Sequence, residues 1–118
     1  MNGKILSEAE LKFMETVWEN EPVKSGNLVK IFAEKEGWKK STVYTYLKNL
    51  SKSGFVINKN SIVISYIEKK DYYSSLAREL LAKYFKNDMG NFIAAYKNGE
   101  QLTRDELIDF YAKGKNYR

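Results

Sequence analysis

The fold is decided by residues 39–67, which read KKSTVYTYLKNLSKSGFVINKNSIVISYI. Apolar side chains at positions 43, 47 and 50 recur at helical spacing before Gly54, and they predict a helix that buries one stripe. Two runs rich in β-branched and aromatic residues follow, at 55–57 and 62–67, and the sequence NKNS at 58–61 between them is typical of a turn. We therefore expect a helix followed by a β-hairpin.

Two further helices are expected ahead of this stretch. Ser7-Glu8-Ala9-Glu10 is a capping box, which predicts a helix start, and Asn20-Glu21-Pro22 ends that helix. A second helix is expected from a Ser25 N-cap to a Gly37 C-cap. Three helices and a hairpin in this order match a winged helix-turn-helix, so the predicted fold class is mainly α with a small β-hairpin.

Beyond Lys69-Lys70-Asp71 the pattern becomes purely helical, with caps at Asp88 and at Thr103-Arg104-Asp105-Glu106. We therefore divide the chain into a winged helix-turn-helix domain, 1–70, and a helical dimerisation segment, 71–118. Short helices bury little surface alone, so a second copy of the segment is the expected partner; the alternative is that they fold back on their own winged domain. The expected dimer residues are Leu76, Leu80, Tyr84, Phe92, Ile93, Tyr96, Leu107, Ile108 and Tyr111.

The stretch between Glu36 and Glu68 carries charge of one sign. It contains no acidic residue but five lysines, in a chain whose 20 basic and 15 acidic residues give a net charge of +5. Such a surface, with polar and aromatic side chains among the lysines, is typical of DNA binding by a helix in the major groove and a flanking hairpin.

We expect the DNA contacts to come from this stretch. Its short hydroxyl side chains suit phosphates, base edges or the thymine methyl, and its lysines suit phosphates. The alternatives are helix capping for the hydroxyls and, for Tyr44, packing against the wing. The expected DNA-binding residues are Lys39, Lys40, Ser41, Thr42, Tyr44, Thr45, Lys48, Lys52 and Lys59.

The composition excludes many enzyme classes. The chain has no cysteine and no histidine, which removes thiolate zinc sites, thiol catalysis and histidine-based nucleophile pairs. The glutamates near residues 8–19 are expected to be a solvated helix face, so no enzymatic activity, cofactor or metal is predicted. No apolar run is long enough to span a bilayer and no signal peptide precedes the first helix, so we expect a cytoplasmic protein without direct membrane insertion.

Two motifs resemble the penicillinase repressor family: 5–18, with Ile5-Leu6-Ser7-Glu8-Ala9-Glu10-Leu11, Met14 and Val17-Trp18, and 38–54, with Trp38-Lys39-Lys40-Ser41-Thr42-Val43-Tyr44-Thr45-Tyr46-Leu47, Leu50, Lys52 and Gly54. Glu100-Gln101-Leu102-Thr103 extends the likeness towards the end of the chain. The resemblance implies a homodimeric repressor whose winged helices each bind half of a palindromic DNA operator through the third helix and wing.

The resemblance also implies a way of releasing the DNA. In the family, which often regulates antibiotic resistance, an antibiotic-sensing membrane protease leads to a cut in the C-terminal helices, so that the dimer falls apart. The scissile Asn-Phe pair has two candidates in this chain. Counting back from Glu100 places it at Ala95-Tyr96, whereas the literal dipeptide is Asn91-Phe92.

Three departures from the family pattern matter. The copper-responsive branch carries a C-terminal cysteine cluster that this chain lacks, so the chain is assigned to the non-copper branch. Lys39-Lys40-Ser41 stands where Ser-Pro-Lys commonly opens the third helix. Asn60-Ser61-Ile62 replaces the usual Gly-Arg of the wing tip, which leaves Lys59 as the only expected wing cation.

Two functions from other classes stay open at this point. One is a winged helix used for protein–protein assembly, in which the aromatic C-terminal segment binds another protein. The other is a regulator that responds to a small molecule held in an aromatic cleft between dimer halves. Loss of operator binding on adding a ligand would indicate the latter.

Overall fold

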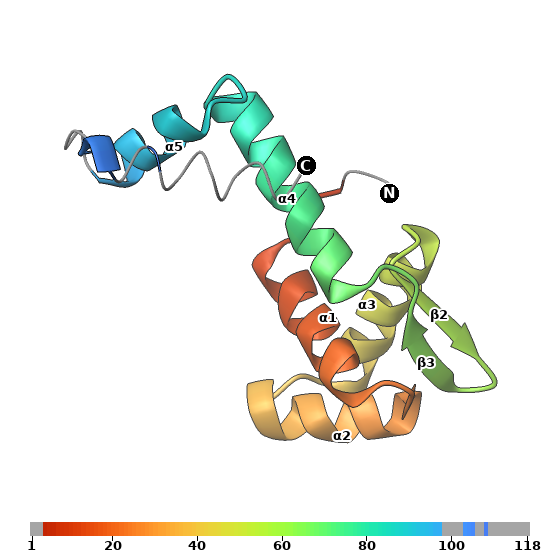
Figure 1. Cartoon of the computed structure of the whole chain (residues 1–118). Helices are drawn as coiled ribbons and strands as arrows, with labels where there is room; N and C mark the ends of the chain where they lie inside the picture. The colour runs from red at the N-terminus through yellow and green to blue at the C-terminus, as the bar shows by residue number, and fades with distance from the viewer. Residues whose placement is uncertain (1–3, 98–102, 106–107, 109–118) are drawn as a thin grey trace. The chain divides into compact units, whose positions relative to one another are not determined.

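The computed structural model describes residues 4–97, 103–105 and 108. The chain divides into two compact units, one ending at Ser74 and one beginning at Ser75, which we call the winged unit and the second unit. The elements, drawn in Figure 1, are α1 (Glu8–Asn20), β1 (Val23–Lys24), α2 (Ser25–Glu36), α3 (Lys40–Lys52), β2 (Val56–Lys59), β3 (Ile62–Ser65), α4 (Lys69–Tyr84) and α5 (Met89–Tyr96). The predicted fold class is confirmed, because the described chain is mainly helical and carries a small antiparallel sheet in the winged helix-turn-helix order.

The capping box begins α1 as predicted. The Ser7 hydroxyl accepts a hydrogen bond from the Glu10 amide at 3.2 Å, and the Glu10 carboxylate accepts one from the Ser7 amide at 2.9 Å. These bonds satisfy two amides that the first turn cannot pair by itself. The inner face of the helix buries Phe13, Met14 and Val17.

The predicted cap of the second helix is wrong by one residue. Lys24, not Ser25, is the N-cap of α2, and its side chain makes no capping hydrogen bond. Ser25 is the first helical residue because the chain enters α2 directly from β1, and its buried amide donates a hydrogen bond to the Ser61 carbonyl at 2.8 Å. The other end agrees with the prediction: Gly37, at φ +68°, is a left-handed C-cap.

The third helix carries the buried stripe that its spacing predicts. Val43, Leu47 and Leu50 are all buried on α3. The helix ends at Lys52, and Gly54, at φ +83°, turns the chain towards β2.

The sheet has three strands where two were predicted, in the order β1-β3-β2. The additional strand, β1, pairs antiparallel with β3, with Val23 opposite Val63 and Lys24 opposite Ile62. A strand of two residues is too short to show a period of two, so the pattern of the sequence could not reveal it.

The hairpin turn is tighter than predicted. β2 continues to Lys59 and β3 begins at Ile62, so that only Asn60 and Ser61 connect them. Both connecting residues have positive φ, 53° and 65°, as in the type I′ turn that matches the twist of a hairpin. Asn58 and Lys59, expected in a four-residue turn at 58–61, are therefore strand residues paired with Val63 and Ile62.

Aromatic rings fill the space between the helices of the winged unit. Phe13 of α1 stacks on Phe32 of α2 with ring centroids 5.5 Å apart, Phe32 stacks on Trp38 at 4.6 Å, and Trp38 stacks on Tyr46 of α3 at 5.0 Å. Stacked rings bury large areas and fix the distance between the elements that carry them. This series thus joins all three helices.

The start of α4 belongs to the winged unit. Tyr72 is buried, and its hydroxyl accepts a hydrogen bond from the Leu6 amide at 2.9 Å. The Tyr73 hydroxyl donates to the Glu15 carboxylate at 2.6 Å, and Lys69 forms an ion pair with the same carboxylate at 2.9 Å. The helix begins at Lys69, ahead of residue 72 where the helical pattern was expected to start.

The second unit contains the rest of α4 and α5. Asp88 caps α5 as predicted, because its carboxylate accepts hydrogen bonds from the amides of Gly90 and Asn91 at 2.7 and 3.3 Å. Arg104 and Asp105 are helical, and the rest of the helix expected after residue 103 lies almost entirely outside the described residues. Among the residues that the structure describes, no helix is both long and apolar enough to cross a bilayer.

Candidate nucleic-acid interface

The predicted DNA-binding side chains of α3 lie on its exposed face. The buried stripe of this helix points into the core, which leaves the opposite stripe open to solvent. Thr42 is half-buried between the two stripes. The exposed members are Lys39, Lys40, Ser41, Tyr44, Thr45, Lys48 and Lys52.

The hydroxyl of Thr45 is partly engaged. It donates a hydrogen bond to the Ser41 carbonyl at 2.8 Å, one turn back along the helix. Its proton is therefore used within the protein, while its oxygen lone pairs and its methyl group remain available. Thr45 can accept a hydrogen bond from a base edge or contact a thymine methyl, and it is poorly placed to donate one.

Tyr44 holds α3 against the start of α2. Its hydroxyl donates to the Ser25 hydroxyl at 3.2 Å, and the ammonium group of Lys40 lies 6.0 Å from the centre of its ring. The side chain keeps 37 % of its surface exposed. Tyr44 thus has an internal role, which was not among those weighed from the sequence, and retains an open ring face beside the lysine.

Among the residues that the structure describes, the lysines of this surface have no acidic partner. Within the described residues the ion pairs with carboxylates involve Lys4, Lys12, Lys69 and Lys70. The lysines predicted to bind DNA form none of these pairs, and no acidic residue occurs from 37 to 67. Like charges gathered on one face create a positive potential that attracts a polyanion.

Both helices of the helix-turn-helix have a lysine as their N-cap residue. The N-caps Lys24 and Lys39 provide no side-chain hydrogen bond to the first turn, and neither first turn contains an acidic residue. By contrast, α1 and α5 are capped by Ser7 and Asp88. Because the helix dipole opposes a positive charge at an N-terminus, the two lysine caps are unfavourable until an anion lies nearby.

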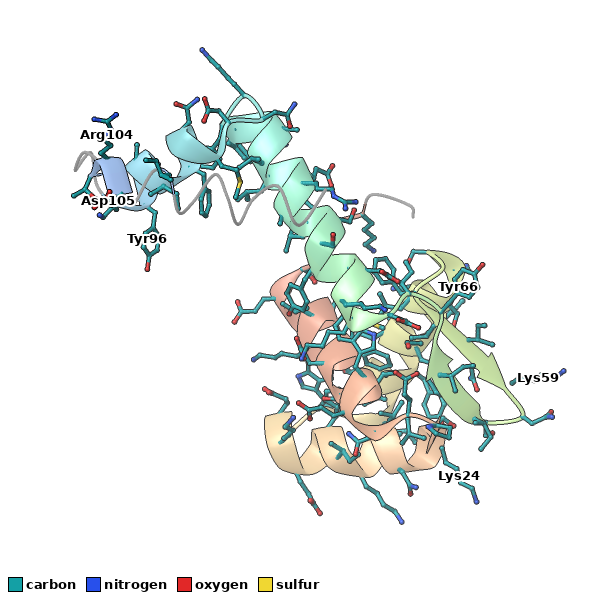
Figure 2. All side chains as sticks on the ribbon, in the orientation of Figure 1. Lys24, Lys59, Tyr66, Tyr96, Arg104 and Asp105 are labelled. Carbon is teal, nitrogen blue, oxygen red and sulfur yellow. The ribbon has the colours of Figure 1, made fainter. Side chains whose placement is uncertain are left out.

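The wing lies beside the start of α2. The hydrogen bond from the Ser25 amide to the Ser61 carbonyl joins the hairpin turn to the first residue of this helix. Lys59, the predicted wing cation, is exposed at the end of β2 and projects outward in Figure 2. Lys24 projects outward as well, and its proximity to the wing was missed because β1 gave no pattern.

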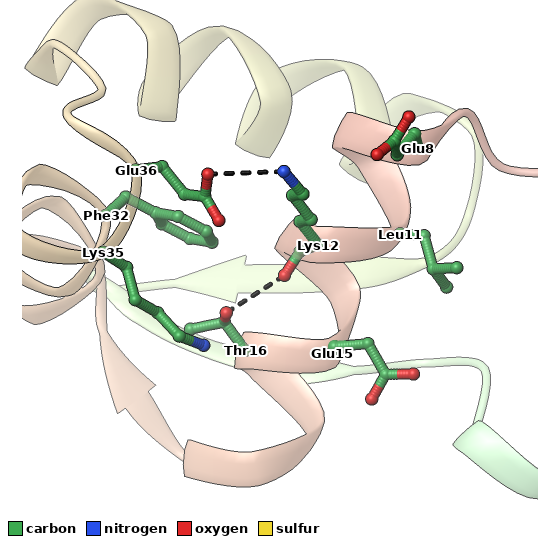
Figure 3. A pocket seen from close by; sticks show the side chains of 8 residues that line it. All are labelled: Glu8, Leu11, Lys12, Glu15, Thr16, Phe32, Lys35 and Glu36. Carbon is green, nitrogen blue, oxygen red and sulfur yellow. Dashed lines mark hydrogen bonds and ion pairs between the residues drawn. The ribbon is translucent and has the colours of Figure 1, made fainter.

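A groove of about 230 Å³ between α1 and α2 has a different character (Figure 3). Leu11 and Phe32 contribute apolar surface to it, and a Lys12–Glu36 ion pair of 3.3 Å lies at its edge. Its lining contains charges of both signs. A polyanion would meet carboxylates here, so this groove is not part of the candidate interface.

The residues predicted to form a dimer lie in the second unit and are poorly covered. Leu76, Phe92 and Ile93 are half-buried. Leu80, Tyr84, Tyr96 and Ile108 are 37, 64, 79 and 61 % exposed, and Figure 2 shows Tyr96 pointing into solvent. Leu107 and Tyr111 lie outside the described residues.

Both candidate cleavage sites lie in α5. Asn91, Ala95 and Tyr96 are exposed, whereas Phe92 is half-buried and packs edge-on against Phe85 with ring centroids 5.3 Å apart. No residue of α5 is buried. A helix without buried residues opens at low free-energy cost, which a protease needs before it can bind an extended backbone.

Helices α2 and α3, the turn at Gly37 between them and the following hairpin define a winged helix-turn-helix protein. The penicillinase repressor family model matches residues 6–113, which span both units, and the chain belongs to this family. Members of the family are DNA-binding transcriptional repressors and not enzymes. A comparison with curated proteins finds no match.

Proposed function

We propose that the chain is a cytoplasmic, homodimeric repressor that binds a palindromic operator, each winged unit reading one half-site. The observation that carries the proposal is the exposed stripe of α3, where hydroxyl groups lie beside lysines that form no ion pair with a carboxylate in the described part of the chain. A helix of this kind fits the major groove, and the hairpin beside it reaches the adjacent backbone.

The side chains divide into two groups by chemistry. Ser41, Thr42 and Thr45 are short enough to bring the helix close to the base edges, so they supply sequence preference together with the exposed ring face of Tyr44. The lysines bind phosphates, which supplies affinity that falls steeply with salt and carries little sequence information. Lys39 and Lys40 start the helix, Lys48 and Lys52 follow along it, and Lys59 lies on the wing.

Binding of the purified protein to DNA fragments from its own upstream region, across a salt series, tests the proposal. The key variant is Thr45→Ala/Lys48→Ala, and Lys70→Ala/Ser74→Ala is the matched control, because it removes one exposed hydroxyl and one exposed lysine from α4. We expect tight, salt-dependent binding to one palindromic fragment, lost in the first variant and kept in the control.

Weak binding to every fragment, unchanged by Thr45→Ala/Lys48→Ala, would contradict the proposal. That result would favour a winged helix used for protein assembly, with the aromatic second unit as the contact surface. Specific binding that a small molecule abolishes would instead favour the ligand-responsive alternative.

The proposed dimer rests on the exposure of apolar and aromatic side chains in the second unit. Leu80, Tyr84 and Tyr96 are each more than one-third exposed, in a unit whose described residues include none that is buried. A two-fold dimer would cover the same surface on both copies. It would also hold two α3 helices over two half-sites, so that binding of the first raises the effective concentration of the second.

We also propose that cleavage in α5 lifts repression, through a membrane sensor protease. Separating the dimer would remove the gain from linked half-sites without touching α3. Mass spectrometry of the chain after exposure to a cognate sensor under inducing conditions tests this. A cut at Asn91-Phe92 or Ala95-Tyr96 is expected, and an intact chain would contradict the proposal.

Release by copper through a cysteine cluster does not fit this chain. It has none of the cysteines that such a cluster needs, and no histidine. We therefore place it in the branch of the family that does not respond to copper. Operator binding that persists unchanged when cuprous ion is added is the expected result.

A further inference from the structure

Three side chains form a row across one face of the sheet. Lys24 of β1 and Lys59 of β2 both lie opposite Ile62 of β3, the central strand. Neighbouring residues on adjacent strands point to the same face, and all three side chains of this row are exposed. The opposite face buries Val23 and Val63 against the core. We call Lys24, Ile62 and Lys59 the wing row.

The wing row has a positive and uncompensated charge. Neither lysine forms an ion pair with any residue in the described part of the chain. Glu21, the acidic residue closest to Lys24 in sequence, is occupied with Ser65, whose amide and hydroxyl donate to its carboxylate at 2.9 and 2.8 Å. Figure 2 shows that Lys24 and Lys59 project away from the winged unit.

An open groove of about 770 Å³ borders the wing row between the end of α1, the start of α2 and the sheet. Lys24, Asn27, Lys30 and Ile62 contribute to its lining, which contains no carboxylate. Two lysines and an amide side chain around an open groove can approach an anion without meeting a like-charged group.

Hydrogen bonds connect the wing row to the exposed stripe of α3. The Ser25 amide, next to Lys24 in the chain, donates to the Ser61 carbonyl at 2.8 Å, next to Ile62. The Ser25 hydroxyl accepts from the Tyr44 hydroxyl at 3.2 Å. The start of α2 therefore connects the wing row to the stripe of α3, so a ligand bound to one would lie near the other.

We propose that the wing row is a second phosphate-binding site of the DNA interface, in which Lys24 and Lys59 bind backbone phosphates beside the half-site read by α3. Strands lie about 4.8 Å apart, so the two lysines start about 10 Å apart with the uncharged Ile62 between them. Lys24 is thus the second wing cation, and it replaces the arginine that the wing tip lacks. The inference rests on the proposed function, because it presupposes that α3 binds DNA.

The test compares how the affinity for the operator fragment and for an unrelated duplex depends on salt. Lys24→Ala removes one cation of the wing row, and Lys59→Ala removes the other. Lys70→Ala is the control with the same change of net charge, since Lys70 is an exposed lysine of α4. Lys24→Ala/Ile62→Lys returns a cation to the wing row one strand away. Thermal unfolding establishes that each variant is folded.

We expect Lys24→Ala and Lys59→Ala each to reduce the slope of log affinity against log salt by about 0.9, the value for one phosphate contact. Both DNA fragments should lose affinity by a similar factor, because phosphate contacts carry no sequence information. The control should keep the full slope, and Lys24→Ala/Ile62→Lys should regain it.

A folded Lys24→Ala variant whose salt dependence of affinity equals that of the unchanged protein would overturn the inference. Contact with a protein partner would then be the better explanation for the exposed Ile62. That failure is distinct from failure of the proposed function, in which the unchanged protein itself would bind no fragment specifically. A loss of slope that Ile62→Lys does not restore would also overturn it, because the effect would then be structural.

Discussion

The winged unit and the second unit differ in where their apolar side chains lie. The buried apolar residues among those described all fall between Leu6 and Tyr72, whereas no described residue from Ser75 onward is buried. Burial of apolar surface is the main favourable contribution to folding. The winged unit is therefore stabilised by its own contacts, and the second unit leaves apolar surface that a partner would cover.

The largest expected effect tests the core of the winged unit. Phe13→Ala removes a fully buried ring that stacks on Phe32, so it should lower the free energy of unfolding by about 3–5 kcal/mol. Both tryptophans, Trp18 and Trp38, lie in the winged unit, so their fluorescence during urea denaturation reports on this unit. Tyr96→Ala, at a ring 79 % exposed, is the control and should change the value by less than about 0.5 kcal/mol. Equal losses of unfolding free energy in Phe13→Ala and Tyr96→Ala would mean that the two units do not differ in how much their side chains stabilise the fold.

The next effect concerns association rather than folding. Leu80→Asp places a charge on the apolar surface of the second unit, and should weaken dimerisation by about 2 kcal/mol or more, roughly thirtyfold. Sedimentation velocity measures the monomer–dimer equilibrium. Ala82→Asp, at an exposed position on the opposite side of the helix, should leave it unchanged. Leu80→Asp could instead lower the urea midpoint and leave the protein dimeric. That result would mean that Leu80 stabilises the fold of the single chain and does not contribute to the dimer.

A smaller loss is expected where α4 is joined to the winged unit. Tyr72→Phe removes the hydroxyl that accepts a hydrogen bond from the Leu6 amide. The buried amide of Leu6 then has no acceptor. The expected cost is about 1–3 kcal/mol in the free energy of unfolding, measured by the same fluorescence. An unchanged value would mean that water replaces the hydroxyl.

The smallest effect depends on pH. The hydrogen bond to Glu15, together with burial, raises the pKa of Tyr73 to about 12 from its ordinary 10.0. Partial burial raises the pKa of Glu15, but the hydrogen bond from Tyr73 and the ion pair with Lys69 outweigh it and hold that pKa below its ordinary 4.5. Tyr73→Phe should cost about 0.5–1 kcal/mol near neutral pH, because the pair is partly exposed.

The sign of each shift sets the pH range of this stabilisation. A raised tyrosine pKa contributes fully below pH 10 and its contribution is lost as pH rises towards 12. A lowered glutamate pKa contributes above its ordinary value and is lost as pH falls through the pKa of the folded state. The difference between the unchanged protein and Tyr73→Phe should thus be flat from about pH 5 to about pH 9 and shrink at both extremes. Tyr66→Phe, at a side chain 71 % exposed, is the control and should change the free energy of unfolding by less than about 0.5 kcal/mol near neutral pH.

The elements with long or strongly signalled patterns were predictable. The capping box at Ser7, the glycine cap at Gly37 and the stripe of Val43, Leu47 and Leu50 all appear as expected, because each is a local rule that tertiary contacts did not override. β1 and the cap of α2 were not predictable. Both depend on pairing between residues 23–24 and the distant strand β3, which no local pattern contains.

The candidate site shows the same limit. The exposure of Thr45 and Lys48 follows from the helical period, so it could be predicted. The hydrogen bond between Tyr44 and Ser25 joins residues 19 positions apart in the chain, and the position of Lys24 beside Lys59 depends on a strand that had no signal. The roles assigned to the second unit stay predictions.

The lysine N-caps of α2 and α3 place positive charge where the helix dipole disfavours it, and the protein without a ligand keeps this unfavourable arrangement. Replacing Lys24 or Lys39 with aspartate or serine would give the helix a better N-cap, worth about 1 kcal/mol, and would remove positive charge from the proposed DNA-binding surface. A binding partner that supplies anions relieves this unfavourable arrangement and stabilises the folded state by mass action. Selection for thermal stability at these two positions would therefore oppose binding, and the more stable aspartate or serine variants are expected to bind the anionic ligand more weakly.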